Sequence, residues 1–234
     1  VERRFRVQRP SIVTGIGIDL AAIDDVHHDV DGFRARFRLG DRPYLLYVGR
    51  VDESKGAVVL ANSYAAYAER HIAGSGHKDA PALVLLGDAI STVPAHPGIT
   101  VTGAVDEATK NAALAGCLAL VQPSYFESFS IVLCEAWAHR KPAIVQGECA
   151  VLAGQARRSG GGIPYHGFAE LEAAIELVAS DAELRTELGT AGRRYVEHRY
   201  RWDELLGRYE SFLGEVVSTW SRSPTPERRR AVRA

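Results

Sequence analysis

Short, mostly apolar runs recur along the chain and alternate with longer segments of helical periodicity. The runs are four or five residues long and lie at 44–48, 82–86, 99–102, 117–121, 143–146 and 162–165. Strands that are apolar at consecutive positions are typical of parallel sheets with both faces covered by helices. The pattern therefore predicts an α/β fold, a doubly wound parallel sheet with helices on both faces.

The helical segments complete this prediction. Helices are expected at 55–71, from Asp106 onward, from about Ser128, at 168–179 and 181–197, and at 202–220. The last of them has apolar residues at i, i+3, i+4 and i+7 spacing, a wide stripe that predicts packing against another surface. Residues 1–40 show no regular period and are expected to be irregular.

The same patterns predict how the chain is organised. Residues 1–40 would form a connector and the start of the domain, and 41–200 a Rossmann-like domain. Residues 201–220 would form a packing helix. Residues 221–234, which include three consecutive arginines, would form a disordered basic tail, and peripheral membrane contact by a full-length protein stays open. Because Met is absent, even at position 1, we expect the chain to be part of a longer protein.

Composition narrows the function classes. With 28 Lys and Arg against 29 Asp and Glu, the net charge is −1, which predicts no general affinity for nucleic acid. No apolar run approaches the ~18 residues of a membrane span, and no secretory signal is visible. Three cysteines without a framework suggest reduced thiols, and hence a cytoplasmic protein.

One candidate site follows the first strong strand, in the segment Gly49-Arg-Val-Asp-Glu-Ser-Lys-Gly56. Arg50 leaves the carboxyl end of the strand, and Lys55 stands where the next helix is expected to start. The free N–H groups of a helix amino terminus, together with a guanidinium and an ammonium, suit a diphosphate. Taken alone, such a segment is more often a surface turn with two solvated cations than a binding site.

A second candidate site is formed by Glu127 and Glu135. Glu127 follows the strand predicted at 117–121, and Glu135 lies on the next helix. Ligands of open α/β sheets bind outside the carboxyl ends of the strands, and two carboxylates there can accept hydrogen bonds from sugar or ribose hydroxyls. The simpler interpretation is that both are exposed acids that complement a helix dipole.

These segments together resemble a known family. Gly49-Arg50 with Lys55-Gly56, then Pro123-Ser124-x-x-Glu127-x-Phe129, then Glu135-Ala136, are similar to the carboxy-terminal domain of family 4 retaining glycosyltransferases, which have the GT-B fold. The resemblance extends from about residue 11 to 220, and the separation of Glu127 and Glu135 matches the family's Glu-x7-Glu motif.

The resemblance implies a role for each matched residue. Arg50 and Lys55, with Gly49 beside them, would bind the donor diphosphate and stabilise the leaving group, and Glu127 would contact the transferred sugar. Glu135 would bind the ribose hydroxyls. Backbone groups would serve the rest of the donor, the base at Gly103, Ala104 and Val105 and the phosphate at Ser130, Ile131 and Val132. The implied donor is a nucleotide diphosphate-sugar, bound without a metal or other cofactor, and the acceptor pocket would belong to an amino-terminal domain.

Departures from the family pattern leave alternatives open. The family commonly has glycine where this chain has Ser128 and Ser130, which also fits a non-catalytic nucleotide- or sugar-binding module of the same fold. A nucleotide-sugar epimerase fits the Arg50, Lys55 and Glu127 combination less well.

Two other site classes are disfavoured. A metal site at His27-His28-Asp29 is disfavoured because adjacent residues on regular elements point in different directions. A serine hydrolase is disfavoured because Ser124 lacks the Gly-x-Ser-x-Gly elbow.

Overall fold

The computed structural model describes residues 11–13, 15–75 and 80–222. They belong to two compact units. The larger is Ile18–Arg199, and the smaller comprises Val1–Gly17 and Tyr200–Ala234. The two units are described separately below.

The larger unit is built on a six-stranded parallel sheet, as predicted. Its strands are β1 (Tyr44–Val48), β2 (Ala82–Leu86), β3 (Ile99–Gly103), β4 (Ala119–Gln122), β5 (Ala143–Gln146) and β6 (Gly162–Tyr165). They are ordered β3-β2-β1-β4-β5-β6, and β1 pairs with β2 from Tyr44↔Ala82 and with β4 from Leu45↔Ala119. The chain order reverses between β1 and β4, so the loops after these two strands flank the topological switch point.

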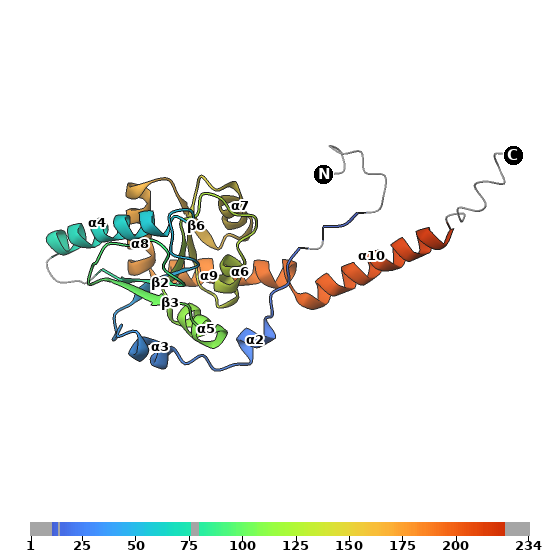
Figure 1. The fold of residues 1–234 in the computed structure, drawn as a ribbon, viewed down its shortest axis with the longest axis horizontal. Helices are drawn as coiled ribbons and strands as arrows, with labels where there is room; N and C mark the ends of the chain where they lie inside the picture. The colour runs from blue at the N-terminus through green and yellow to red at the C-terminus, as the bar shows by residue number, and fades with distance from the viewer. Residues whose placement is uncertain (1–10, 14, 76–79, 223–234) are drawn as a thin grey trace. The chain divides into compact units, whose positions relative to one another are not determined.

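Helices cover both faces of this sheet. They are α2 (Ala21–Asp24), α3 (Val30–Arg36), α4 (Ala57–Ser75), α5 (Glu107–Gly116), α6 (Ile131–Ala138), α7 (Ala150–Ser159), α8 (Phe168–Ser180) and α9 (Ala182–Arg199). α4 and α8 lie on one face and α5 on the other (Figure 1). Leu45 and Tyr47 point toward α4 and α8, whereas the Tyr44 hydroxyl donates to the Ala113 carbonyl of α5 over 2.7 Å. Alternate residues of β1 therefore pack against helices on opposite faces of the sheet, which explains why the apolar run of β1 is unbroken.

Several boundaries differ from the sequence predictions. Residues 1–40 are not wholly irregular, because α2 and α3 fall among them. The Asp29 side chain caps α3 by accepting from the Gly32 amide over 2.8 Å, but only Phe33 of this helix is buried, so it has almost no apolar period. α7 was not predicted at all. α6 begins at Ile131 rather than near Ser128, and α4 at Ala57 rather than residue 55.

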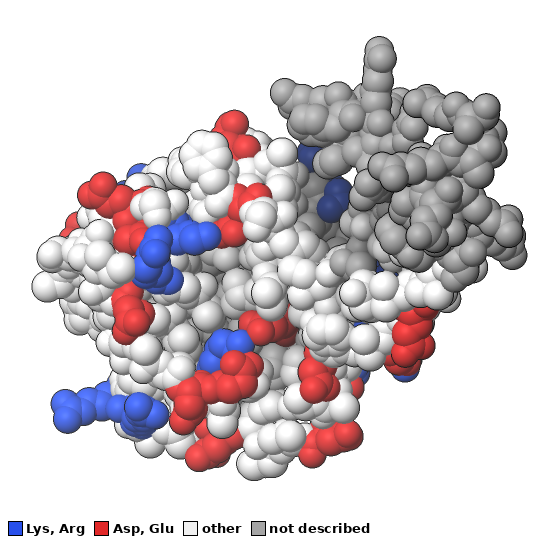
Figure 2. Space-filling model, turned by 45° about the vertical axis from the view of Figure 1, so that its right-hand side comes forward, with Lys and Arg blue, Asp and Glu red and all other residues white. Residues whose placement is uncertain are grey.

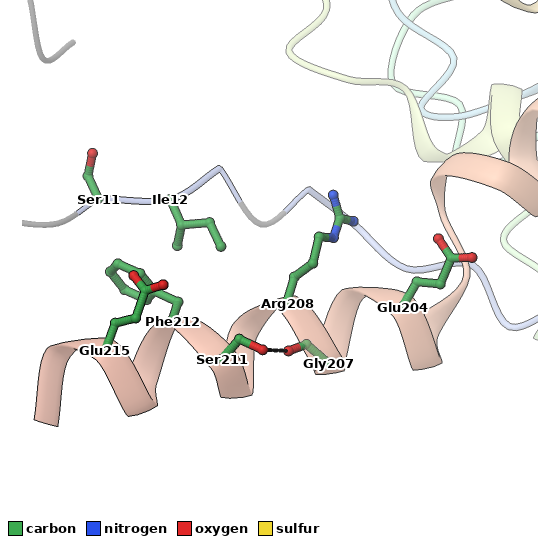
Figure 3. Close-up of a pocket in the computed structure, with 8 residues that line it drawn as sticks. All are labelled: Ser11, Ile12, Glu204, Gly207, Arg208, Ser211, Phe212 and Glu215. Atoms are coloured by element: carbon green, nitrogen blue, oxygen red, sulfur yellow. Dashed lines mark hydrogen bonds between the residues drawn. The ribbon is translucent and has the colours of Figure 1, made fainter. Parts of the chain in front are cut away.

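The smaller unit contains one long helix, α10 (Trp202–Arg222). In Figure 3 the segment with Ser11 and Ile12 runs beside it, and Ile12 points toward the helix. The predicted apolar stripe is nevertheless half exposed, with 49% of Leu206 and 43% of Leu213 accessible. Of the tail expected at 221–234, residues 223–234 lie outside the described residues.

The charged side chains visible on one face (Figure 2) agree with the balanced composition. Acidic and basic side chains are interspersed on the face seen in Figure 2, without a stripe of one sign. Among the described residues, no helix is both long enough and apolar enough to cross a membrane.

Candidate functional site

The loop after β1 is organised by Asp52. Its Oδ1 accepts hydrogen bonds from the Lys55 amide and the Ser54 hydroxyl, both over 2.8 Å, and its Oδ2 lies 2.5 Å from the Arg50 Nε. The Lys55 amide first, and then Arg50 and Ser54, lower the pKa of Asp52 to about 2. Asp52 therefore stays ionised at neutral pH. It anchors the half-exposed Arg50 side chain at Nε, and Nη2 lies 3.5 Å from the Ser54 hydroxyl oxygen, so the guanidinium keeps further N–H donors for a ligand.

The loops after β1 and β4 lie directly against each other. Gly56 has a φ of +74°, and a Cβ built there would stand 2.6 Å from the Pro123 carbonyl oxygen. Only glycine fits both this backbone conformation and this approach. Lys55 is thereby held beside the segment that carries Glu127.

Lys55 and Glu127 form an ion pair, with 2.9 Å between the Lys55 Nζ and the Glu127 Oε1. The Glu127 side chain is 11% exposed and the Lys55 side chain 37%. The structure thus brings together one cation and one acid that the sequence placed in separate candidate segments. Glu127 lies in the loop before α6, not on the helix.

The loop between β4 and α6 is held by two buried glutamines. Gln122 of β4 donates from Nε2 to the Ser130 hydroxyl over 3.2 Å, and Gln155 of α7 donates to the Phe129 carbonyl. Ser130 has a φ of +68°, a conformation that favours glycine, and its side chain does not cap α6. Of the amides predicted to contact phosphate, those of Ile131 and Val132 belong to the first turn of α6, where N–H groups have no partner within the helix.

Glu135 lies in the second turn of α6 and is paired with Lys110 of α5. The Lys110 Nζ lies 2.8 Å from the Glu135 Oε1 and 2.8 Å from the Glu107 Oε1. Asp106 caps α5 by accepting from the Thr109 amide over 2.8 Å, which sets Lys110 one turn into that helix. Each of the two predicted acids is therefore paired with a lysine from another element.

Several backbone groups at the end of β3 and in the loop after it form hydrogen bonds within the protein. The Gly103 carbonyl accepts from the Gly87 amide over 3.1 Å and from the Thr102 hydroxyl over 2.8 Å. The Ala104 amide donates to the Asp88 Oδ1 over 3.2 Å. These bonds fix the backbone of the segment predicted to meet a base.

Four residues of the site were missed by the sequence reasoning: Asp52, Lys110, Gln122 and Gln155. Asp52 carried a local signal, because an Asp side chain often accepts from a backbone amide a few residues later in a turn. The other three carried none. Lys110 pairs with Glu135, which is distant in sequence. Gln122 and Gln155 are polar residues, one within an apolar strand and the other within a helix that was not predicted.

The disfavoured metal candidate is not assembled in the described part of the chain, which contains no cluster of three or more His, Cys, Asp or Glu suited to a metal. His28 instead has its Nε2 2.9 Å from the Ile23 carbonyl. The cysteines Cys117, Cys134 and Cys149 are buried and free, and burial raises the pKa of Cys117 to about 12.

With this geometry in place, a family model is informative. The model for glycosyl transferases group 1 matches residues 42–181, which include the sheet, the Arg50 loop, Glu127 and Glu135. The chain belongs to this family. Its fold corresponds to the carboxy-terminal domain of GT-B glycosyltransferases.

Individual proteins are similar over about half their length. The chain is 28% identical over 189 residues to alpha-D-kanosaminyltransferase of Streptomyces kanamyceticus, covering 75% of this chain and 47% of that protein. Sucrose-phosphate synthase from Thermosynechococcus elongatus superposes with a TM-score of 0.70 at 21% identity, over 93% of this chain and 56% of the synthase. HepE of Anabaena, crystallised in complex with UDP-glucose, has a TM-score of 0.65 at 15% identity, over 88% and 56%. The chain thus spans about half of each.

Proposed function

We propose that this chain is the donor-binding half of a retaining glycosyltransferase, which moves a sugar from a nucleotide diphosphate-sugar to an acceptor. The observation that carries the proposal is the Lys55–Glu127 pair at the carboxyl ends of β1 and β4, beside Arg50. This edge of an open α/β sheet is where ligands bind. The pair supplies a cation for phosphate and an acceptor for sugar hydroxyls.

In this proposal Arg50 and Lys55 stabilise the departing diphosphate. When the bond between the anomeric carbon and the diphosphate oxygen breaks, its electron pair moves onto the diphosphate, and the two cations lower the energy of that charge. The first-turn amides of α6, at Ile131 and Val132, add N–H donors and the positive end of a helix dipole. Donor binding then requires no metal ion.

The carboxylates orient the neutral parts of the donor. Glu127 accepts hydrogen bonds from hydroxyls of the transferred sugar, and Lys55 leaves it for the diphosphate when the donor binds. Glu135 accepts from the ribose hydroxyls. The fixed backbone at Gly103, Ala104 and Val105 borders the base.

We assign the acceptor pocket to a domain outside this chain. The chain covers 47% of the kanosaminyltransferase and 56% of the synthase, and transfer in a two-domain cleft needs closure that excludes water and aligns the reacting atoms. The isolated chain should therefore bind nucleotide weakly and transfer no sugar. Turnover by the purified chain would contradict this assignment.

The test is ligand-dependent stabilisation. The chain is titrated with UDP, GDP and ADP and with their glucose forms, and the thermal midpoint is recorded. A ligand that binds only the folded state raises the free energy of unfolding by mass action, by about 2.7 kcal/mol at one hundred times its Kd, and so raises the midpoint. We expect one nucleotide series to raise it and Arg50→Ala to abolish the rise.

Arg70→Ala is the matched control, because Arg70 pairs with Glu172 between α4 and α8, outside the candidate site. It should leave the nucleotide effect intact. If millimolar concentrations of all three series have no effect, or if Arg50→Ala shows the full rise, the proposal is wrong.

A second candidate is a non-catalytic nucleotide- or sugar-binding module. Ser130 favours it, because a side chain stands in the left-handed position at the start of α6, where the donor loop needs close backbone approach. An assay of the full-length protein for sugar transfer separates the two: nucleotide binding without transfer to any acceptor supports the module.

A further inference from the structure

The ion pair between Lys110 and Glu135 is the best-buried charged contact next to the proposed donor site. Both side chains are only 17% exposed, and the Nζ–Oε1 distance is 2.8 Å. The second acid on Lys110, Glu107, is 72% exposed. The exposed Lys110–Glu107 pair contributes little to stability. Removing one partner of the sheltered Lys110–Glu135 pair leaves the other charge unpaired, which lowers the free energy of unfolding.

The two residues of the pair lie on helices that pack against each other. The Lys110 amide donates to the Asp106 carbonyl over 3.0 Å in the first turn of α5, which Asp106 caps. Glu135 sits on α6, which packs against α5. Burial alone would lower the pKa of Lys110, but its hydrogen bonds to Glu107 and Glu135 outweigh burial and raise it, so the ammonium is charged.

The contact with Lys110 leaves the Glu135 carboxylate able to accept further hydrogen bonds. Lys110 contacts Oε1 of Glu135. A carboxylate has about four lone-pair sites on two oxygens, so Glu135 keeps acceptor capacity for a pair of hydroxyls. A carboxylate held in one orientation by a charged neighbour loses less entropy when it binds such a pair.

We propose that Lys110 is a positioning residue that sets Glu135 to recognise the ribose diol of the donor nucleotide. This inference rests on the proposed function. It adds that Lys110 governs discrimination between ribo- and deoxyribonucleotides, although Lys110 itself contacts only Glu135 and Glu107. A lysine that only competed with the ligand for Glu135 would have the opposite effect, because its removal would strengthen binding.

The experiment compares nucleotides that differ in one hydroxyl. The probe is whichever of UDP, GDP and ADP binds most tightly, together with its 2′-deoxy and 3′-deoxy forms, and affinities are measured by calorimetry on the whole chain. We expect the unmodified protein to prefer the ribose form over at least one deoxy form by about tenfold, the typical effect of a hydrogen bond to a charged group. Lys110→Met should lower the affinity for the ribose form about tenfold and bring that preference close to one.

Four further variants make the result specific. Lys110→Arg keeps a cation and should retain most of the preference. Glu107→Gln, the matched control, removes only the exposed partner and should leave the preference unchanged. Glu135→Gln should remove it, and the double variant Lys110→Met/Glu135→Gln should lose no more than Glu135→Gln alone, because the two residues act as one unit.

The outcomes separate the inference from the function on which it rests. If nucleotides bind and Lys110→Met keeps the ribose preference, or binds the ribose form more tightly, the positioning role is wrong while donor binding stands. If no nucleotide binds the unmodified chain, the proposed function fails and the inference with it. Should Lys110→Met not fold, Lys110→Gln and the Glu135→Gln variant provide the same comparison.

Discussion

Lys55 and Glu127 are 72 residues apart in the chain, yet their side chains meet with 2.9 Å between Nζ and Oε1. Gly56 makes this contact possible, because its missing Cβ lets the loop after β1 lie against the Pro123 carbonyl. In this pair the cation proposed for phosphate and the acid proposed for sugar neutralise each other. Opening of the pair would make all the hydrogen-bonding capacity of both groups available to the nucleotide-sugar.

Opening of this pair predicts opposite effects of its two members on nucleoside diphosphate binding. Lys55→Met removes a phosphate contact and should weaken binding about tenfold or more, the scale of a charge-assisted hydrogen bond. Glu127→Gln removes a competitor for Lys55 and should leave binding equal or tighter. Calorimetry with UDP, GDP and ADP measures both.

Glu127→Gln leaves only the 37%-exposed Lys55 unpaired and should alter stability little, whereas Lys55→Met leaves the 11%-exposed Glu127 without its cation and should lower stability. Arg70→Met, which removes a cation elsewhere, serves as the control and should bind normally. Equal loss of binding in Lys55→Met and Glu127→Gln would contradict the competition between phosphate and Glu127.

We expect serine, glycine and alanine at position 130 to differ in the stability that they give the fold. Ser130→Ala loses the hydrogen bond from the Gln122 Nε2 and keeps the positive φ, so it should lower the free energy of unfolding by about 1–3 kcal/mol. Ser130→Gly loses the same bond but relieves a left-handed backbone worth about 1–2 kcal/mol, so its loss should be smaller. Urea unfolding compares them, with Ser211→Ala on the exposed face of α10 as the control. Alanine as stable as glycine would contradict the backbone argument.

Gly56 predicts a large effect from a single methyl group. Gly56→Ala places a Cβ 2.6 Å from the Pro123 carbonyl oxygen at a φ of +74°, and should lower the free energy of unfolding by at least about 2 kcal/mol. The same change at Gly207 of α10, where a Cβ meets nothing within 4 Å, should stabilise slightly because alanine favours helices. A Gly56→Ala protein as stable as the parent would show that the two loops separate easily.

His139 predicts part of the acid sensitivity of the fold. Its Nε2 lies 3.0 Å from the Asn111 Oδ1, and its ring stands 4.8 Å from that of His28. Burial first, and then the neighbouring His28, Lys141 and Arg193, lower its pKa to about 3, against the opposing charge of Asp24. In the unfolded chain the pKa of His139 is near 6.5. Between about pH 6.5 and 3 the unfolded chain therefore binds a proton at His139 that the folded chain does not bind. Stability should therefore fall as pH drops from about 6.5 toward 3.

The test is urea unfolding at several pH values. His139→Gln cannot take up this proton, so its stability should decline less steeply below pH 6.5, by at most one proton, or about 1.4 kcal/mol per pH unit. His198→Gln, on the exposed last turn of α9, is the control and should follow the parent. Identical slopes for His139→Gln and the parent would exclude this contribution.

The sheet could be predicted because its signal is local. The inner strands β1 and β2 are buried on both faces, so Tyr44–Val48 and Ala82–Leu86 appear in the sequence as unbroken apolar runs. α3 lacked such a signal, since Phe33 is its only buried residue, and α7 was hidden by polar Gln155, which is buried for its hydrogen bond rather than its hydrophobicity. A period in hydrophobicity reports burial of apolar groups and misses helices held by other contacts.

For the candidate site, the sequence alone determined which loops follow which strands, and hence that Arg50, Lys55, Glu127 and Glu135 belong near one edge of a parallel sheet. Only the tertiary structure decided the pairing: Lys55 with Glu127, and Glu135 with Lys110, a residue that no pattern singled out. The physical reason is the separation along the chain of the residues that interact. Strand and helix periods arise between neighbours in the chain, whereas an ion pair depends on how two separately formed loops or helices pack, to within a fraction of an ångström.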